Sequence, residues 1–420
     1  MSLPAVPAPP VAPSRPRRRL LLVVTPLVVL LAALAVTAGV QLNRPAPAGV
    51  LRVSVPGSLS IPGQVTDVPW PARGQAHLGV DGLGTIGSAG DGASVPIGSV
   101  AKVMTAYVVL IDHPLDVGQD GPAMTVTAAD VADYRARIPS GQSLVPVTAG
   151  ERLTERQALQ ALMLPSANNV AQMLAKWDAG GADAFVAKMN TTAASLGMAG
   201  THYTDPSGFA PTTVSTAADQ TRLAEQALKL PAFAEIVAQP SATLPVAGTV
   251  RNYNSLLGVD GVFGIKTGST DEAGGNLLFA AHLTVADKTL TVVGAVLGQP
   301  GRNTDEQLAA VNAIVRPLLT AARRLVRVYT VLPAGTVGEV RTAWGETVPV
   351  RTASDVQVIG WPGLTVTVTV RPERPGPRVT SGQQLGALTA HTIAGDVTTD
   401  LRADATVTGP SRWWRLTRTS

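Results

Sequence analysis

Three short segments of the sequence contain hydroxyl, amine and amide side chains at spacings that suit acyl-transfer chemistry. In Ser99-Val100-Ala101-Lys102, a loop enters an apolar stretch, and a helix would put residues i and i+3 on one face. A neutral lysine amine can then take the serine proton while the serine attacks a carbonyl. The alternative is a helix cap followed by a solvated lysine. Because the chain has no cysteine, a nucleophile must be oxygen or nitrogen.

A second segment, Ser166-Ala167-Asn168, follows an apolar stretch at a break within a predicted helix. A hydroxyl and an amide two residues apart can point into one cleft, where the hydroxyl relays a proton and the amide holds a substrate carbonyl or the lysine. An ordinary polar turn is the alternative interpretation.

A third segment, Lys266-Thr267-Gly268, ends the apolar strand predicted over residues 262–267. A lysine and a hydroxyl at a strand edge suit the binding of a carboxylate, and the glycine would let a substrate backbone approach the strand closely. A simple strand terminus is the alternative. Each segment alone is weakly specific, but the three together, in this order, favour a single active site.

Hydrophobic periodicity predicts the elements that must position these segments. Strands that are adjacent in sequence and joined by short turns favour an antiparallel sheet. Thr154 and Gln157 form a capping-box pattern at the start of a helix. Helices are predicted over residues 99–111, 154–177, 182–196, 215–230 and 304–325, strands over 51–55, 262–267, 276–283 and 289–297, and a hairpin over 75–86. After residue 325, short alternating strands such as 348–351 and 364–370 predict a small all-β domain.

Residues 20–40 form an apolar run whose only polar members are Thr25 and Thr37, long enough as a helix to cross about 30 Å of hydrocarbon. Four arginines precede it between residues 15 and 19 and a single one, Arg44, follows it. The positive-inside rule therefore puts the N-terminus in the cytoplasm and the rest of the chain outside. A cleaved secretory signal is the alternative, but the run exceeds the about 7 to 15 apolar residues of a typical signal core, so we expect an uncleaved anchor.

The composition excludes several classes of protein. With 45% hydrophobic residues the chain can bury a large core, which excludes disorder as its main state. It carries 33 basic and 29 acidic side chains, but five of the arginines lie in the first 44 residues, which contain no acid. Removing those five leaves 28 basic against 29 acidic residues, so the rest has no electrostatic surface of the kind that nucleic acid requires. The five histidines have no ligand-like spacing, and no metal or other cofactor is predicted.

Taken together, the three segments resemble the motifs of the penicillin-binding proteins and serine β-lactamases. The surrounding residues, 95–105, 150–174 and 261–275, are similar to the serine D-alanyl-D-alanine carboxypeptidases, a low-molecular-mass branch of the penicillin-binding proteins. The resemblance implies an α/β (α+β) fold of the β-lactamase/transpeptidase type. In this fold an antiparallel sheet is flanked by helices, an all-helical lobe stands beside it, and the active site lies between the two.

The resemblance also implies roles for the motif residues. The implied catalytic residues are Ser99, Lys102 and Ser166, and the implied substrate-binding residues are Asn168, Lys266, Thr267, Gly268 and Ser269. Ser99 would be the acylated nucleophile and Lys102 its general base, while Lys266 and Thr267 would recognise the terminal carboxylate of D-alanine. The backbone N–H groups of Ser99 and Ser269 would form an oxyanion hole. The base role requires a lowered lysine pKa, which burial near Lys266 would supply.

The implied function is that of a serine-type D-Ala-D-Ala carboxypeptidase that trims peptidoglycan stem peptides through an acyl-enzyme, with β-lactam antibiotics as acylating inhibitors. One alternative is a β-lactamase. A class A enzyme would use a glutamate between the second and third motifs to deacylate, and none occurs over residues 156–224. The other alternative is a catalytically silent protein that binds the cell wall or senses penicillin, but such a protein would not need Lys102.

The expected organisation is a single-pass cell-membrane protein with an extracellular catalytic domain, or a secreted one if the N-terminal segment is cleaved. The predicted parts are a disordered Pro/Arg-rich cytoplasmic tail over 1–19, a transmembrane helix or signal segment over 20–41, a linker over 42–74, a catalytic domain over 75–325 and a β-rich accessory domain over 326–420. Trp413 and Trp414 are expected at a strand edge in the core, with the bilayer interface as the alternative. The segment Asp205-Pro206-Ser207-Gly208-Phe209 resembles a loop near the cleft in relatives, but a structural turn is the favoured interpretation.

Overall fold

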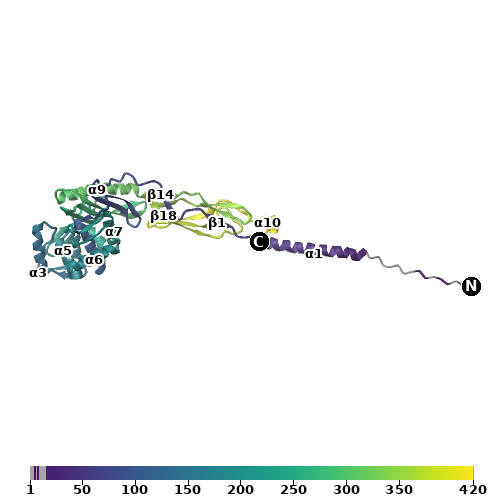
Figure 1. Ribbon diagram of the computed structural model, residues 1–420, viewed down its shortest axis with the longest axis horizontal. Helices are drawn as coiled ribbons and strands as arrows, with labels where there is room; N and C mark the ends of the chain where they lie inside the picture. The colour runs from purple at the N-terminus through teal and green to yellow at the C-terminus, as the bar shows by residue number, and fades with distance from the viewer. Residues whose placement is uncertain (1–3, 6, 9–15, 420) are drawn as a thin grey trace.

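The computed structural model describes residues 4, 5, 7, 8 and 16–419. Its parts follow one long axis, with an N-terminal helix at one end, an elongated β region in the middle and a mixed helix–sheet body at the far end (Figure 1). The predicted tail, residues 1–19, lies mostly outside the described residues. Helix α1 (Pro16–Asn43) begins inside it, so the helix starts four residues before the apolar run predicted from residue 20.

A five-stranded antiparallel sheet, in the order β11-β12-β13-β3-β4, forms the centre of the body. Alternate residues of β12 face opposite sides, because strand side chains have a period of two. Leu278 and Ala280 belong to the core of the helical side, whereas Leu277 and Phe279 belong to the core under α9. The elements are β3 (Gln75–Val80), β4 (Gly84–Ala89), β11 (Val262–Thr270), β12 (Gly274–Val285), β13 (Lys288–Gln299) and α9 (Thr304–Leu325). The predicted hairpin, the antiparallel order and the final helix are confirmed.

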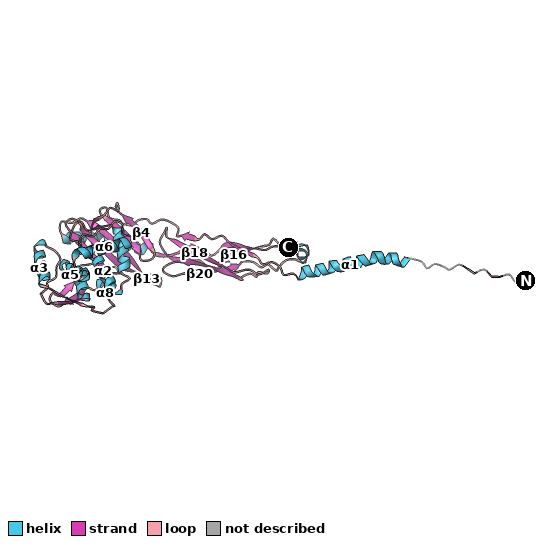
Figure 2. Cartoon of the chain, turned by 60° about the horizontal axis from the view of Figure 1, so that its bottom comes forward, coloured by secondary structure: helices cyan, strands magenta, loops and turns pink. Residues whose placement is uncertain are grey.

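Seven α-helices and two short 3-10 helices form the helical lobe, which lies at the end of the molecule remote from α1 (Figure 2). The capping box predicted from Thr154 and Gln157 is present at the start of α4 (Glu155–Met163). The helix predicted over 154–177 is two helices, since Pro165 has no N–H to continue the first one. The lobe contains η1 (Gly98–Ala101), α2 (Lys102–Asp112), α3 (Ala128–Arg137), η2 (Ile138–Ser140), α4 (Glu155–Met163), α5 (Asn168–Ala179), α6 (Ala182–Ser195), α7 (Ala217–Ala227) and α8 (Pro231–Val237).

Three short antiparallel pairs complete the body. They are β5 (Val95–Pro96) with β8 (Val214–Ser215), β6 (Ala123–Thr125) with β7 (Arg152–Thr154), and β9 (Ser241–Leu244) with β10 (Gly248–Arg251). The first pair directly precedes η1 and therefore fixes the point at which the chain enters the first motif.

The β region has a third hydrophobic core of its own. Its main sheet has the order β1-β15-β16-β20-β19-β18-β2, and β14 pairs with β17 beside it. The strands are β14 (Arg327–Leu332), β15 (Thr336–Arg341), β16 (Thr347–Thr352), β17 (Val356–Gly360), β18 (Thr365–Pro372), β19 (Gln384–His391) and β20 (Val397–Ala403). Both edge strands, β1 (Val50–Val53) and β2 (Ser58–Ser60), come from the predicted linker. The part of the predicted linker around β1 and β2 thus belongs to the β region and is not only a spacer, because its backbone groups pair with the open edges of the sheet.

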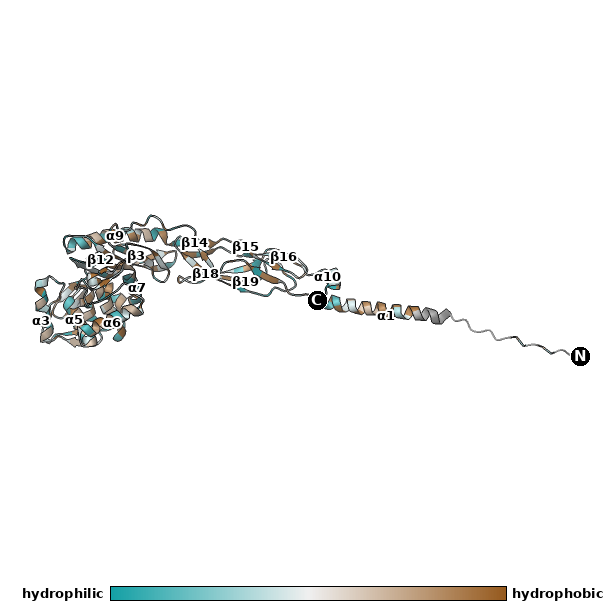
Figure 3. Ribbon diagram, in the orientation of Figure 1, coloured by the Kyte–Doolittle hydropathy of each residue, from teal (hydrophilic) through white to brown (hydrophobic). Residues whose placement is uncertain are grey.

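Helix α1 stands apart from the rest of the molecule. Its segment Val23–Asn43 has a mean hydropathy of 2.5 and is not buried by the remainder of the chain (Figure 3). Residues Arg412–Thr417 form the short helix α10, which packs beside the end of α1. The prediction that Trp413 and Trp414 occupy a strand edge is therefore wrong. Ser411 caps the N-terminus of α10 through a bond from the Trp414 N–H, and this cap favours a helical turn over a strand.

Candidate active site

The first motif stands where η1 leads into α2. Ser99 lies in η1 and Lys102 is the first residue of α2, so the turn brings the two side chains together. The Lys102 ammonium donates to Ser99 Oγ at 2.8 Å, to Asn168 Oδ1 at 2.6 Å and to the Ser207 carbonyl at 2.9 Å. Its side chain is fully buried.

The three hydrogen-bond partners of Lys102 Nζ determine where its lone pair points when the amine is neutral. Burial lowers the pKa of Lys102 well below its usual value, and the nearby Lys266 ammonium lowers it further, while Asp205 acts in the opposite direction. A neutral amine keeps two hydrogens and one lone pair. The Asn168 and Ser207 oxygens can only accept hydrogen bonds, so the neutral Lys102 amine donates its two hydrogens to these two oxygens. Its lone pair therefore faces the Ser99 hydroxyl. The geometry thus suits a base that takes the Ser99 proton.

The second motif lies in the break between α4 and α5. Ser166 has a φ of 66°, a conformation that costs an L-residue about 1–2 kcal/mol, and its buried Oγ has no hydrogen-bond partner among the described residues. Asn168 accepts from Lys102 through Oδ1 and donates to Gln142 Oε1 at 2.9 Å through Nδ2. The amide orientation is therefore fixed from both ends, and the Ser166 hydroxyl remains available to a ligand.

The third motif runs along β11, which is an edge strand of the sheet. Lys266 is buried, its Nζ donates to the Thr267 carbonyl at 3.1 Å, and burial lowers the pKa of Lys266 to about 7. A carboxylate that enters the site would favour the ammonium form and raise this pKa again. The Ser269 hydroxyl donates to Gln307 and to Thr304 Oγ1 at the start of α9, which holds the end of β11 in place.

Two glycines let the first and third motifs approach each other. A Cβ on Gly268 would stand 3.0 Å from Ser99 N and 2.9 Å from the Ile97 carbonyl, and a Cβ on Gly98 would stand 3.3 Å from Ser269 N. The sequence suggested that Gly268 makes room for substrate backbone; the structure shows that the close neighbour is the backbone of η1. The backbone segments that carry the N–H groups of Ser99 and Ser269 are consequently in close contact, as an oxyanion hole built from these two groups requires.

The loop before α7 contributes a group that the sequence reasoning missed. Asp205 Oδ2 accepts from the N–H groups of Ser207 and Phe209, and this turn aims the Ser207 carbonyl at Lys102. Thr105 of α2 donates to the Pro206 carbonyl at 2.6 Å and holds the turn against the helix. The segment is thus a turn, as favoured, but it also lies at the cleft, as the alternative interpretation had it. The Asp-Pro-Ser-Gly pattern predicted the turn, but it did not predict that the Ser207 carbonyl would accept a hydrogen bond from Lys102.

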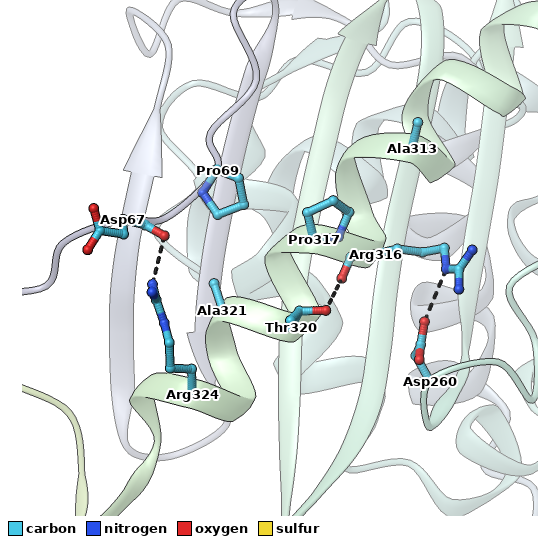
Figure 4. Close-up of a pocket in the computed structure, with 9 residues that line it drawn as sticks. All are labelled: Asp67, Pro69, Asp260, Ala313, Arg316, Pro317, Thr320, Ala321 and Arg324. Carbon is cyan, nitrogen blue, oxygen red and sulfur yellow. Dashed lines mark hydrogen bonds and ion pairs between the residues drawn. The ribbon is translucent and has the colours of Figure 1, made fainter.

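All three motifs open onto one cavity of 370 Å³. Gln142 and Tyr253, which the sequence reasoning also missed, belong to its walls, because the loops that carry them fold over it from distant parts of the chain. A larger cavity lies on the outer side of α9, where Arg324 donates to the Asp67 carbonyl and Arg316 pairs with Asp260 (Figure 4). That larger cavity contains none of the three motifs, whereas residues of all three line the smaller one, which is therefore the candidate active site.

Comparison with known proteins decides the family. The family model for D-alanyl-D-alanine carboxypeptidases (peptidase family S11) matches residues 87–300, about half of the 420 residues. The chain belongs to this family. As a member of the S11 D-alanyl-D-alanine carboxypeptidases it is a serine peptidase, and the predicted family and fold class are confirmed. The β-lactamase and silent-binder alternatives are not favoured.

Two curated relatives carry the same activity in their names. The D-alanyl-D-alanine carboxypeptidase of Streptomyces sp. (strain K15) is 36% identical over 229 residues, which is 50% of this chain and 75% of the relative. The D-alanyl-D-alanine carboxypeptidase DacB2 of Mycobacterium tuberculosis is 38% identical over 185 residues, 42% of this chain and 59% of the relative. Both matches leave a substantial part of this S11 chain outside the aligned segment.

Solved structures extend the likeness to the fold. The Streptomyces K15 DD-transpeptidase has a TM-score of 0.51 at 28% identity and covers 60% of this chain and 99% of its own. Penicillin-binding protein 5 of Haemophilus influenzae has a TM-score of 0.55 at 20% identity and covers 80% of this chain. The second likeness shows the fold alone, and its wider coverage fits an S11 body followed by a β region.

Proposed function

We propose that this protein is a membrane-anchored serine D-Ala-D-Ala carboxypeptidase that removes the terminal D-alanine from peptidoglycan stem peptides through an acyl-enzyme on Ser99. The observation that carries the proposal is the environment of Lys102 Nζ. It lies 2.8 Å from the Ser99 hydroxyl, and its two other partners are obligate acceptors. A buried amine held in this way is a general base for one hydroxyl only.

Acylation follows from the positions of the groups. The peptide lies along the edge of β11, with its terminal carboxylate on Lys266 and Thr267. Lys102 takes the Ser99 proton while Oγ attacks the carbonyl of the penultimate D-alanine, and the N–H groups of Ser99 and Ser269 hold the developing oxyanion. When the C–N bond breaks, the proton passes from Lys102 through the Ser166 hydroxyl to the leaving amine of D-alanine.

Deacylation reverses the proton path. A water molecule attacks the ester carbon, Lys102 takes a proton from it, and the same proton returns to Ser99 Oγ as the C–O bond breaks. A β-lactam enters the same path, because its ring carbonyl takes the place of the peptide carbonyl. Its amine leaving group stays tethered to the acyl-enzyme, so β-lactams are expected to acylate Ser99 and leave it slowly.

Helix α1 supports the proposed location. Its length and hydropathy are sufficient to span a membrane, and the arginines between residues 15 and 19 outnumber the single Arg44 on the other side. We place the N-terminus in the cytoplasm and the body outside the cell, where peptidoglycan lies. In this arrangement residues 75–325 form the catalytic domain, and residues 326–420 form an accessory domain together with strands from the 42–74 segment.

The test uses a labelled penicillin and the full chain. Label should attach to the parent protein, be located at Ser99 by mass spectrometry of peptides, and be absent from Ser99→Ala. The matched control is Ser140→Ala, which removes another serine hydroxyl from the cavity wall and should label normally. Free D-alanine should be released from a pentapeptide that ends in D-Ala-D-Ala. Equal labelling of Ser99→Ala, or no D-alanine release by a protein that labels normally, would contradict the proposal.

A further inference from the structure

The C-terminal segment of the described chain meets the outer end of α1, near Asn43. The Arg418 guanidinium donates to the carbonyls of Gln41, Arg44 and Pro45, at 3.3, 2.8 and 3.0 Å. Arg415 donates to the Leu42 carbonyl at 3.0 Å. The last carbonyls of a helix have no partner within the helix, so these two arginines satisfy groups that otherwise need water.

The same arginine ties α10 to the β region. Its guanidinium lies 5.5 Å from the ring centroid of Trp414, and the Trp414 ring meets Trp344 edge-on at 5.8 Å. Trp344 lies in the turn between β15 and β16. Although it carries a charge, Arg418 is only 9% exposed, so α1, α10 and the β sheet form one packed joint. We call residues 411–418 the clasp.

The outward side of the clasp is apolar and basic. Trp413 is 75% exposed and Leu416 is 40% exposed, and these two residues lie three apart on one face of α10. Arg412 and Arg415 lie beside them, and no acidic residue occurs over 405–419 or over 41–66. Exposed tryptophan and arginine next to the end of an apolar helix match the headgroup region of a bilayer that contains anionic lipid.

We propose that the clasp binds the headgroup layer of an anionic bilayer around the outer end of α1, so that the enzyme stands on the membrane at a fixed angle. The inference rests on the proposed membrane span of α1. Trp413 and Leu416 enter the interface, Arg412 and Arg415 contact lipid phosphates, and Arg418 transmits the attachment to the β region. The β region then holds the active site away from the bilayer, toward the cell wall (Figure 1).

The absence of cysteine makes the test direct, since any introduced thiol is unique. Leu416→Cys, Leu31→Cys and Val246→Cys are each labelled with the fluorophore NBD in the full chain, in nanodiscs of phosphatidylcholine and phosphatidylglycerol. Lipids that carry a nitroxide in the headgroup should quench the label at position 416 several-fold more than the label at Val246, an exposed site on the body. Lipids with a nitroxide in the acyl chain should quench the label at position 31.

The outcomes separate the two proposals. If position 31 is quenched while position 416 behaves like position 246, α1 spans the bilayer and the clasp inference is wrong; the surface then serves a protein or a glycan. If position 31 is not quenched, both the span and the clasp fail.

In the Leu416→Cys protein, Arg418→Ala should abolish the quenching, and the matched control Arg402→Ala, an arginine of β20 paired with Asp400, should retain it. Unchanged quenching in Arg418→Ala overturns the role of the clasp, and normal penicillin labelling of each variant shows that it is folded.

Discussion

Asn168→Asp tests the proposed role of Lys102 with almost no change of shape. The new carboxylate oxygen would stand 2.6 Å from Lys102 Nζ in place of the amide oxygen. At an effective dielectric constant of 20, the attraction between two unit charges at this distance is about 6 kcal/mol. The free-energy cost of burying the carboxylate offsets part of this attraction. Half of the attraction would still raise the pKa of Lys102 by about two units.

The sign of the effect on activity follows directly. Lys102 is a base only when it is neutral, so a higher pKa moves the acidic limb of the pH–rate profile to higher pH. At pH values below the pKa of Lys102, a rise of about two units should slow acylation by about 100-fold relative to the parent protein. The assay is the second-order rate constant for acylation by a fluorescent penicillin, measured from pH 5 to 10. Asn168→Ala is the matched control, because it removes the same hydrogen bond without adding charge and should slow acylation without raising the limb. Equal limbs in Asn168→Asp and the parent would show that Lys102 is not the base.

Three further predictions concern other buried groups. Burial lowers the pKa of Lys266 to about 7, so carboxylate recognition, measured as kcat/KM on a D-Ala-D-Ala peptide, should fall as pH rises above about 7, and Lys266→Arg should move this basic limb upward. Gly208→Ala would put a Cβ 1.8 Å from the Gly98 carbonyl and should cost more than about 3 kcal/mol in urea unfolding, whereas Gly118→Ala, with a similar φ and open space, should cost about 1–2 kcal/mol. Burial raises the pKa of Glu155 to about 7, and its carboxylate has no hydrogen-bond partner in the part of the chain that the structure describes. Since the folded protein keeps this proton to higher pH than the unfolded chain, Glu155→Gln should raise Tm at pH 8 and leave it unchanged at pH 4.

The parts of the site that the sequence predicted are those in which local spacing fixes the geometry. A helical turn brings residues 99 and 102 together whatever the rest of the fold does, and an apolar strand carries Lys266 and Thr267 along its edge. The predicted end of this strand at residue 267 is wrong, because β11 continues to Thr270. The capping box at Thr154 and the antiparallel order of β11, β12 and β13 were predictable for the same reason. Periodicity and turn chemistry act over a few residues, and these features need nothing more.

The parts that could not be predicted depend on contacts between distant segments. The Ser207 carbonyl reaches Lys102 from 105 residues away, and Gln142 reaches Asn168 from 26 residues away. In both cases the sequence shows a polar loop and gives no sign of its partner. The pairing of β1 with β15 is a further case: the sequence predicted a strand over 51–55, close to β1 at Val50–Val53, but nothing in the sequence identified its partner about 290 residues away. It forms because the open edge of the sheet supplies the hydrogen bonds.

The same pairing explains why the N-terminal anchor and the accessory domain belong together. The chain leaves α1 at Asn43, joins the accessory sheet through β1 at Val50, and returns to α1 through Arg418 after β20. The sheet is therefore attached to the end of α1 by two connections, whereas a flexible linker would have attached it by one. If α1 spans the membrane as proposed, a peptidase attached in this way cannot turn its active site freely toward the bilayer. Loosening the joint with Arg418→Ala should therefore leave the hydrolysis of a small soluble peptide unchanged and alter only the action on polymeric peptidoglycan; an equal loss on both substrates would show that the joint acts through stability rather than through position.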